Sequence, residues 1–372
     1  METEPVLFEK LATGNDRRIG VITLNAEKRL HSLTLEMVES IRNMLARWIE
    51  DEDIACILIT GAGNRAFCAG GDVIGLHRSA TGTIGGPCVY AEAFFEHEYR
   101  MDLLFHACPK PVIAWGNGIV MGGGLGILSG CSHRVVTPKT RMAMPEVTIG
   151  LYPDVGGGWF FNRMPGQTGL FLALTGATFN AADALYVGIA DYCLGDDQLP
   201  AMMEMLRVQA WADTAAENHG IVDRLLADLE ADSRVSLPEG NIEPNRERID
   251  SLCGGSDLMA VSDAIKALSS KDRWLASAGD NLMQGSPLSA VVSYRHLKQC
   301  RTLSLRQVFQ TELVLSTHLV RYPEFAEGVR ALLIDKDKAP QWQYRSIRKV
   351  PTALVDSFFQ PPWPENPLSD LE

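Results

Sequence analysis

The sequence predicts an α/β protein in which strands and helices alternate to about residue 195 and helices dominate afterwards. The first observation is the run IACILIT at 54–60, which is apolar throughout and of strand length, as a buried parallel strand requires. The second is that glycine-rich loops follow such strands and lead into helices. The third is that strand signals fade beyond this point and amphipathic stretches take over. We therefore expect an α/β core over 1–195 and a mostly helical C-terminal region over 196–372.

The elements of the core can be placed from periodicity and turn chemistry. Residues 5–25 are expected to form two strands joined by a turn. Residues 33–51 carry apolar side chains at helical spacing, and Thr34 is placed to cap that helix. A helix is expected around 91–107 and a strand at 111–118. The repeated passage from strand through glycines to helix indicates several similar ββα or βα units.

Composition narrows the classes of partner. The formal net charge of −12 argues against nucleic acid, because phosphate binding needs a basic surface. Eight cysteines are scattered without a CxxC pair or a Cys/His cluster, so no metal is expected. No apolar run reaches the length that spans a bilayer, so no membrane partner is expected. The first ten residues resemble no targeting signal, and a cytoplasmic protein is the expectation.

Two glycine-rich loops follow strands, GAGNRAFCAGGD at 61–72 and NGIVMGGGLG at 117–126. The first lacks the GK[ST] of a phosphate loop, and no GxGxxG follows the first strand. Tight turns that need a positive φ are one explanation for the glycines. The other is that each loop presents a bare backbone N–H, because two such donors aimed at one point form an oxyanion hole.

Two carboxylates occupy the segment MPEVTIGLYPDVGGG at 144–158, and each directly follows a proline. Pro153 and Gly150 oppose a continuous helix, so Glu146 and Asp154 are expected in first turns or caps. Capping a helix is the alternative role of Asp154. The sequence around Glu146 is apolar, and burial there would raise its pKa, as a general acid or base requires.

These motifs together resemble the crotonase (enoyl-CoA hydratase/isomerase) superfamily. The resemblance is carried, in order, by AFCAGGD, NGIVMGGGLG, AMPEVTIGLYPDVGGG and LALTGATFNAADALYVGIAD. It covers about residues 5–195, with a weaker echo at 323–342, and within the superfamily it is most similar to the 3-hydroxyisobutyryl-CoA hydrolase branch. It implies a crotonase-like spiral of ββα units with a mostly helical C-terminal region, and acyl-CoA thioesters as substrates.

The resemblance also implies roles for particular residues. The oxyanion-hole donors correspond to the N–H groups of Gly71 and Gly123. Hydrolases of this kind pair the glutamate of MPE with the aspartate of PDVGGG, which correspond to Glu146 and Asp154. Hydratases use a second glutamate where this chain has Gly126, and its loss favours hydrolysis over hydration.

Further substrate contacts follow from the same resemblance. Glu98, in the segment FFEHEY, matches a glutamate that helps to hold the acyl group, whereas a solvated helix face is the alternative. The CoA path is expected near Lys28, Arg29, Ala69 and Asp72. Here the chain departs from the family pattern, because LNAEKRLHSL places histidine where the family has asparagine.

The expected function is hydrolysis of a short branched 3-hydroxyacyl-CoA thioester, with 3-hydroxyisobutyryl-CoA as the leading candidate and valine catabolism as the implied pathway. Glu146 would either attack the carbonyl or act as base for water, and Asp154 would orient the substrate hydroxyl or the water. No cofactor is implied, because CoA arrives as part of the substrate. Family members range from single chains to homo-oligomers. An enoyl-CoA hydratase or isomerase and a non-catalytic acyl-CoA-binding protein are the alternatives.

Overall fold

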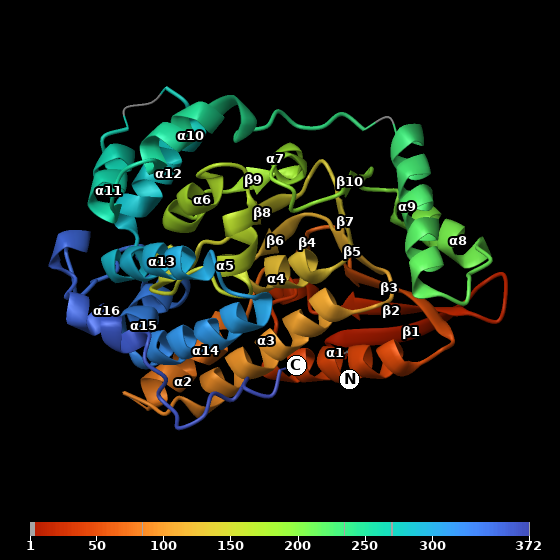
Figure 1. Cartoon of the computed structure of the whole chain (residues 1–372), viewed down its shortest axis with the longest axis horizontal. Helices are drawn as coiled ribbons and strands as arrows, with labels where there is room; N and C mark the ends of the chain where they lie inside the picture. Colours follow the sequence, from red (N-terminus) through yellow and green to blue (C-terminus); the bar gives the residue numbers. More distant parts are fainter. Residues whose placement is uncertain (1–3, 84, 234, 269–270, 372) are drawn as a thin grey trace. The chain divides into compact units, whose positions relative to one another are not determined.

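The computed structural model describes residues 4–83, 85–233, 235–268 and 271–371 (Figure 1). The chain divides into two compact units, and each is assembled from three separate stretches. Unit 1 comprises Met1–Gly71, Met101–Met142 and Phe179–Gly240, and unit 2 comprises Asp72–Arg100, Ala143–Thr178 and Asn241–Glu372. The division of the chain at residue 195 stays a prediction.

Unit 1 is built on a six-stranded sheet in the order β1-β2-β3-β5-β7-β10 (Figure 1). Its strands are β1 (Val6–Ala12), β2 (Arg18–Leu24), β3 (Ile54–Gly61), β5 (Val112–Gly116), β7 (His133–Val136) and β10 (Tyr192–Cys193). The first two strands pair antiparallel as a hairpin, and the other neighbours pair parallel. β3 is buried along its whole length between two parallel partners, which explains its uninterrupted apolar sequence.

A second sheet of four short strands carries the two glycine-rich loops, in the order β4-β6-β8-β9. Its strands are β4 (Ala66–Cys68), β6 (Ile119–Met121), β8 (Arg141–Ala143) and β9 (Phe179–Asn180). β4 lies inside the stretch that the sequence predicted as one loop, because Ala66 and Cys68 of that stretch pair with β6. These two strands run parallel, so the glycines that follow them start from the same edge of the sheet.

Helices cover the six-stranded sheet of unit 1. They are η1 (Glu27–Arg29), α1 (Leu35–Glu50), α4 (Gly123–Gly130), α7 (Ala181–Tyr186), α8 (Leu199–Val208) and α9 (Ala215–Asp232). The cap predicted for α1 is confirmed, because the Thr34 side chain accepts a hydrogen bond from the Met37 N–H at 3.3 Å. The core beneath α8 and α9 joins helix residues such as Leu206 and Leu226 to Leu58 of β3.

Unit 2 is helical in all its regular elements apart from the last residue of β8. Its elements are α2 (Val73–Gly82), η2 (Glu146–Ile149), α5 (Gly157–Phe160), η3 (Phe161–Arg163), α6 (Thr168–Thr175), η4 (Glu243–Asn245), α10 (Arg246–Cys253), α11 (Leu258–Lys266), α12 (Arg273–Gln284), α13 (Pro287–Cys300), α14 (Leu305–Arg321), α15 (Pro323–Val329), the π-helix η5 (Arg330–Ile334), η6 (Ile347–Lys349) and α16 (Thr352–Phe358). The long helix α3 (Val89–Ala107) runs from this unit into unit 1. Among the described residues, no helix combines the length and apolar character needed to cross a membrane.

We predict that Gly124→Ala destabilises unit 1. A Cβ at this position would lie 2.3 Å from the Cys68 carbonyl oxygen, so α4 and β4 would have to separate. The expected loss in the free energy of unfolding is on the order of 1–3 kcal/mol. Urea unfolding measures this loss, and Gly82→Ala is the control variant because a Cβ at that position meets nothing within 4 Å. Equal stability of the two variants would contradict the packing argument.

Candidate functional site

The two predicted oxyanion donors lie in neighbouring loops of unit 1. Gly70 has a φ of +98°, and a Cβ there would lie 3.6 Å from the Gly123 nitrogen, so the loops touch. Gly123 is the first residue of α4, and its N–H therefore has no acceptor within its own helix. Gly71 forms a parallel bridge with Leu33 in which the Gly70 carbonyl accepts from the Leu33 N–H at 2.8 Å. The loops that carry the two predicted oxyanion donors are therefore in contact.

The residues expected along the CoA path belong to both units. Lys28 and Arg29 are exposed on η1, and the loop that follows them receives a hydrogen bond from the Ala69 N–H to the Leu30 carbonyl at 3.0 Å. These residues belong to unit 1. Asp72 begins unit 2, and its carboxylate caps α2 by accepting from the Gly75 N–H at 3.2 Å.

His31, the departure from the family pattern, has a structural role in this loop. It is fully buried with φ at +58°, a conformation that asparagine and histidine adopt more readily than most residues. Its Nδ1 accepts from the Ala26 N–H at 3.0 Å, so its Nε2–H donates to the Ala62 carbonyl at 2.9 Å. Burial lowers the pKa of His31, which keeps the ring neutral in this arrangement. The histidine closes the loop that carries Lys28 and Arg29.

Glu146 begins the short helix η2 in unit 2 and is only 6% exposed. Burial is the main cause that raises its pKa well above the usual range, and the charge of Asp154 adds to the effect. In the described part of the chain, its Oε2 has no hydrogen-bond partner. A buried carboxylate with a raised pKa and an open acceptor is suited to general acid–base or nucleophilic chemistry.

Asp154 is also buried, at 4% exposure, and its Oδ2 accepts a hydrogen bond from the Tyr99 hydroxyl at 2.7 Å. The N-cap of α5 is Gly156, and no side chain caps that helix, so the capping role of Asp154 is wrong. Burial raises the pKa of Asp154 to about 7, the Tyr99 hydrogen bond opposes the rise and the Glu312 charge adds to it. Two buried carboxyls with raised pKa values therefore interact in unit 2.

A buried chain of hydroxyl groups extends from Asp154 into the C-terminal helices. The Tyr99 oxygen lies 2.6 Å from the Ser316 Oγ, which lies 3.1 Å from the Tyr152 oxygen. The Tyr152 hydroxyl donates to the Glu312 carbonyl at 2.8 Å. Sequence reasoning missed this series of hydroxyl groups because its members are far apart in sequence. Tyr99 nevertheless directly follows Glu98, which was predicted to contact the acyl group.

The Glu312 carboxylate holds the glycines that follow Asp154. It is fully buried and accepts from the N–H groups of Gly156 at 2.8 Å and Gly158 at 3.1 Å. The His296 Nε2 lies 3.0 Å from the same carboxylate, and because an ionised carboxylate only accepts, the histidine is the donor. A Cβ at Gly158 would lie 2.6 Å from that Nε2, which explains why glycine is required there.

The segment that carries Glu146 is held by α15 through close backbone contact. A Cβ at Gly150 would lie 2.4 Å from the Glu324 carbonyl oxygen, and a Cβ at Gly328 would lie 2.5 Å from the Ile149 carbonyl carbon. Facing glycines thus allow α15 to approach η2. Glu324, which is buried, accepts from Ser286 and from the Gln343 N–H. The weak echo of the family at 323–342 was the only sequence signal for this support.

Glu98 lies on α3 in unit 2 with 2% of its surface exposed. A solvated helix face, the alternative role for this residue, is therefore wrong. The structure places Glu98, Glu146 and Asp154 in one unit as buried carboxylates. Gly126, the position of the second glutamate in hydratases, is buried within α4 of unit 1. Among the described residues, no group of His, Cys, Asp and Glu could hold a metal ion.

Comparison with known proteins identifies the family. The enoyl-CoA hydratase/isomerase family matches residues 19–359. The mitochondrial 3-hydroxyisobutyryl-CoA hydrolase of Danio rerio is 35% identical over 355 residues, which are 95% of this chain and 89% of the relative. The enzyme of that name from Homo sapiens is 35% identical over 96% of this chain and 89% of its own.

Two solved structures also match most of this chain. A carnitinyl-CoA dehydratase from Mycobacterium thermoresistibile has a TM-score of 0.86 and 32% identity, and the match covers 99% of this chain and 100% of that one. An enoyl-CoA hydratase from Rhodobacter sphaeroides has a TM-score of 0.82 and 32% identity over 96% and 98% of the two chains. These likenesses confirm the crotonase-like α/β fold that the motifs implied.

The expectation of a cytoplasmic protein is wrong. The curated relatives are named as mitochondrial proteins, which contradicts that expectation. The expectation relied on the first ten residues, whereas the compartment is not determined by any contact of the fold. The family match, the curated relatives and the solved structures lead to one conclusion: the chain belongs to the enoyl-CoA hydratase/isomerase (crotonase) family.

Proposed function

We propose that the protein hydrolyses a short branched 3-hydroxyacyl-CoA thioester, most specifically 3-hydroxyisobutyryl-CoA, to the free acid and CoA. The observation that carries the proposal is the pair of buried carboxyls, Glu146 and Asp154, whose pKa values are both raised. Support comes from relatives of that name, which match more than nine-tenths of the chain at about 35% identity. Valine catabolism is the proposed pathway, because this thioester is one of its intermediates.

The proposed mechanism divides the work among four residues. The N–H groups of Gly71 and Gly123 donate to the thioester carbonyl oxygen, which gains negative charge during attack; such donors contribute about 2.7–4 kcal/mol each in enzymes where one was removed. Glu146 either adds to the thioester carbon, releasing CoA and leaving an anhydride that water cleaves, or takes a proton from the attacking water. Asp154 orients the substrate hydroxyl or the water.

The remaining roles are proposed on similar grounds. Glu98 holds the acyl end of the substrate, and Lys28, Arg29, Ala69 and Asp72 lie along the path of CoA. CoA is part of the substrate, and we propose no further cofactor. Self-association of the chain stays a prediction.

Hydration of an enoyl-CoA is the second candidate, because two structural relatives are named as a dehydratase and a hydratase. The observation against it is Gly126. Water addition to a double bond needs two acids that flank it, and glycine stands in α4 where hydratases of the family have one of them. The same residue leaves thioester hydrolysis unaffected, because Asp154 supplies the second carboxyl.

We predict that the protein releases free thiol from 3-hydroxyisobutyryl-CoA and leaves crotonyl-CoA unchanged. Thiol release and the absorbance of the enoyl thioester, followed in parallel, measure the two reactions. Loss of enoyl absorbance without thiol release would reject hydrolysis in favour of hydration.

We predict that Glu146→Gln lowers kcat by at least about 10²-fold, because the amide can neither attack nor accept a proton. Glu36→Gln, at an exposed position in the first turn of α1, is the matched control and should leave kcat unchanged. Thiol release by the wild type no faster than by Glu146→Gln would favour a protein that binds acyl-CoA without turning it over.

The pH dependence should follow the raised pKa values. Glu146 and Asp154 act as carboxylates, so kcat/KM rises with pH as the coupled pair loses its protons. Tyr99→Phe removes a hydrogen bond that lowers the pKa of Asp154, so this profile should move to higher pH. Glu312→Gln removes a negative charge that raises the pKa of Asp154, so the pH profile of this variant should move to lower pH.

The opposite signs of the two shifts separate electrostatics from general damage. Each shift should be roughly half to one pH unit, equivalent to about 0.7–1.4 kcal/mol. Tyr192→Phe in unit 1, whose hydroxyl lies 3.3 Å from Asp223, is the control and should not move the profile. A shift in the same direction for both variants would disprove the assignment.

A further inference from the structure

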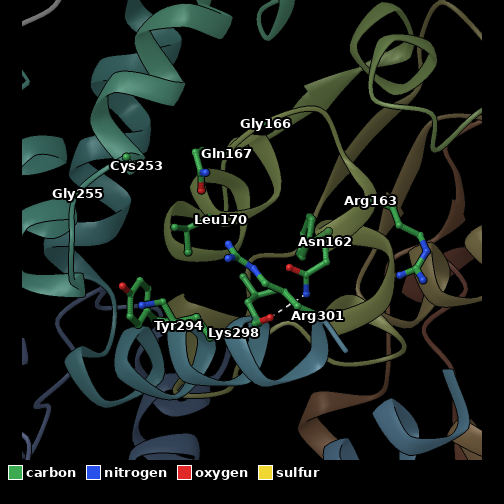
Figure 2. A pocket seen from close by; sticks show the side chains of 13 residues that line it. Asn162, Arg163, Gly166, Gln167, Leu170, Cys253, Gly255, Tyr294, Lys298 and Arg301 are labelled. Carbon is green, nitrogen blue, oxygen red and sulfur yellow. Dashed lines mark hydrogen bonds between the residues drawn. The ribbon is translucent and has the colours of Figure 1, made fainter. Parts of the chain in front are cut away.

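A cavity in unit 2 is lined by none of the residues assigned to the proposed reaction. Its volume is about 590 Å³, within the range of small-molecule sites. Its walls come from the segment 161–170, the turn 253–255 after α10, and α13 (Figure 2). In Figure 2, Arg301 extends from α13 toward Leu170 of α6, and Tyr294 and Lys298 lie beside each other on α13.

The cavity is cationic on a chain whose net charge is −12. Arg163, Lys298 and Arg301 line it, and no carboxylate does. In the described ranges of the chain, no salt bridge involves any of these three side chains, whereas Arg295 of the same helix pairs with Asp356. The cavity therefore concentrates uncompensated positive charge.

Two of these cations rest on aromatic rings, which hold them without neutralising them. The Arg163 guanidinium carbon lies 3.0 Å from the centroid of the Trp159 ring, and Nη1 donates to the Trp159 carbonyl at 2.9 Å. The Lys298 Nζ lies 4.4 Å from the centroid of the Tyr294 ring. Such contacts orient a cation and leave its charge available to an anion.

Helix electrostatics alone does not account for the cluster. Lys298 and Arg301 lie at the C-terminal end of α13, where the helix dipole favours cations. Arg163 belongs to another element, so the dipole of α13 does not explain its presence. Asp250 accepts from the N–H of the lining residue Gln167 at 2.7 Å through its Oδ1, and from Arg246 at 3.0 Å through its Oδ2. In the described part of the chain, no salt bridge joins Asp250 to the three lining cations.

The chemistry of the walls defines the ligand. Arginine and lysine together recognise phosphoryl oxygens, the arginine through its planar fork and the lysine as a point charge. Phe161, Leu170 and Leu297 add apolar surface beside the charges, and the volume exceeds that of inorganic phosphate. We propose that this cavity binds a nucleoside phosphate, with the phosphoryl group against Lys298 and Arg301 and the organic part against Leu170. A free nucleotide and the nucleotide end of CoA are the two sources of this chemistry.

Calorimetric titration of the full-length chain with ADP tests the proposal, together with KM and kcat measured on 3-hydroxyisobutyryl-CoA. The variant is Lys298→Glu/Arg301→Glu. Its control is Arg47→Glu/Lys266→Glu, which changes the net charge equally at exposed sites on α1 and α11. Lys298→Gln/Arg301→Gln serves if the reversal does not fold, as judged by urea unfolding.

A free-nucleotide site predicts that the cavity variant weakens ADP binding by at least about tenfold while KM stays unchanged and the control binds as the wild type does. A site for the nucleotide end of CoA predicts instead that KM rises by at least about tenfold at constant kcat. The proposal is overturned if the cavity variant matches the control in both measurements, or if the wild type binds no ADP and KM is unaffected. The titration with ADP still tests the cavity even if the acyl-CoA is not a substrate, because it measures binding without turnover.

Discussion

The buried carboxylate of Glu312 is the constraint on which the site depends. A charge removed from water costs several kcal/mol unless donors replace its hydration, and here two glycine N–H groups and one histidine do so. The donors fix the backbone directly after Asp154. That backbone includes Val155 at a φ of +48°, a conformation that costs a β-branched residue about 1–3 kcal/mol. The carboxylate thus stabilises a strained turn, and the turn directs Asp154.

The C-terminal helices act as a rigid support for the two acids. α13 supplies His296, α14 supplies Glu312 and Ser316, and α15 supplies the backbone that meets η2. Glycine appears where these helices come closest, because a Cβ would collide with backbone or with the histidine ring. The glycines around Glu146 and Asp154 therefore serve distant partners rather than local turns alone.

Local signals predicted the parts of the protein that local physics determines. An apolar run identified β3, Thr34 identified the start of α1, and Pro145 identified the helical turn that begins with Glu146. The matching prediction for Asp154 was wrong, because α5 begins at Gly157 with Gly156 as its cap. The supports were not predictable in this way, because Glu312 lies on an amphipathic helix and nothing in its own neighbourhood distinguishes a buried glutamate from a solvated one. Its glycine partners became visible only when segments more than 100 residues apart came together, as the separation of 154 between Gly158 and Glu312 shows. The glycine-rich loops were predicted only in part, because the sequence located them but could not show that β4 lies inside the first.

The long separation between Tyr99 and Ser316, 217 positions along the chain, has a consequence for biosynthesis. A ribosome releases the N-terminal part first, at about 5–20 residues per second, so both acids emerge well before the helices that hold them. Until α14 docks, the turn at Val155 has no carboxylate to retain it. The newly made chain therefore holds this turn in place only after α14 has been synthesised.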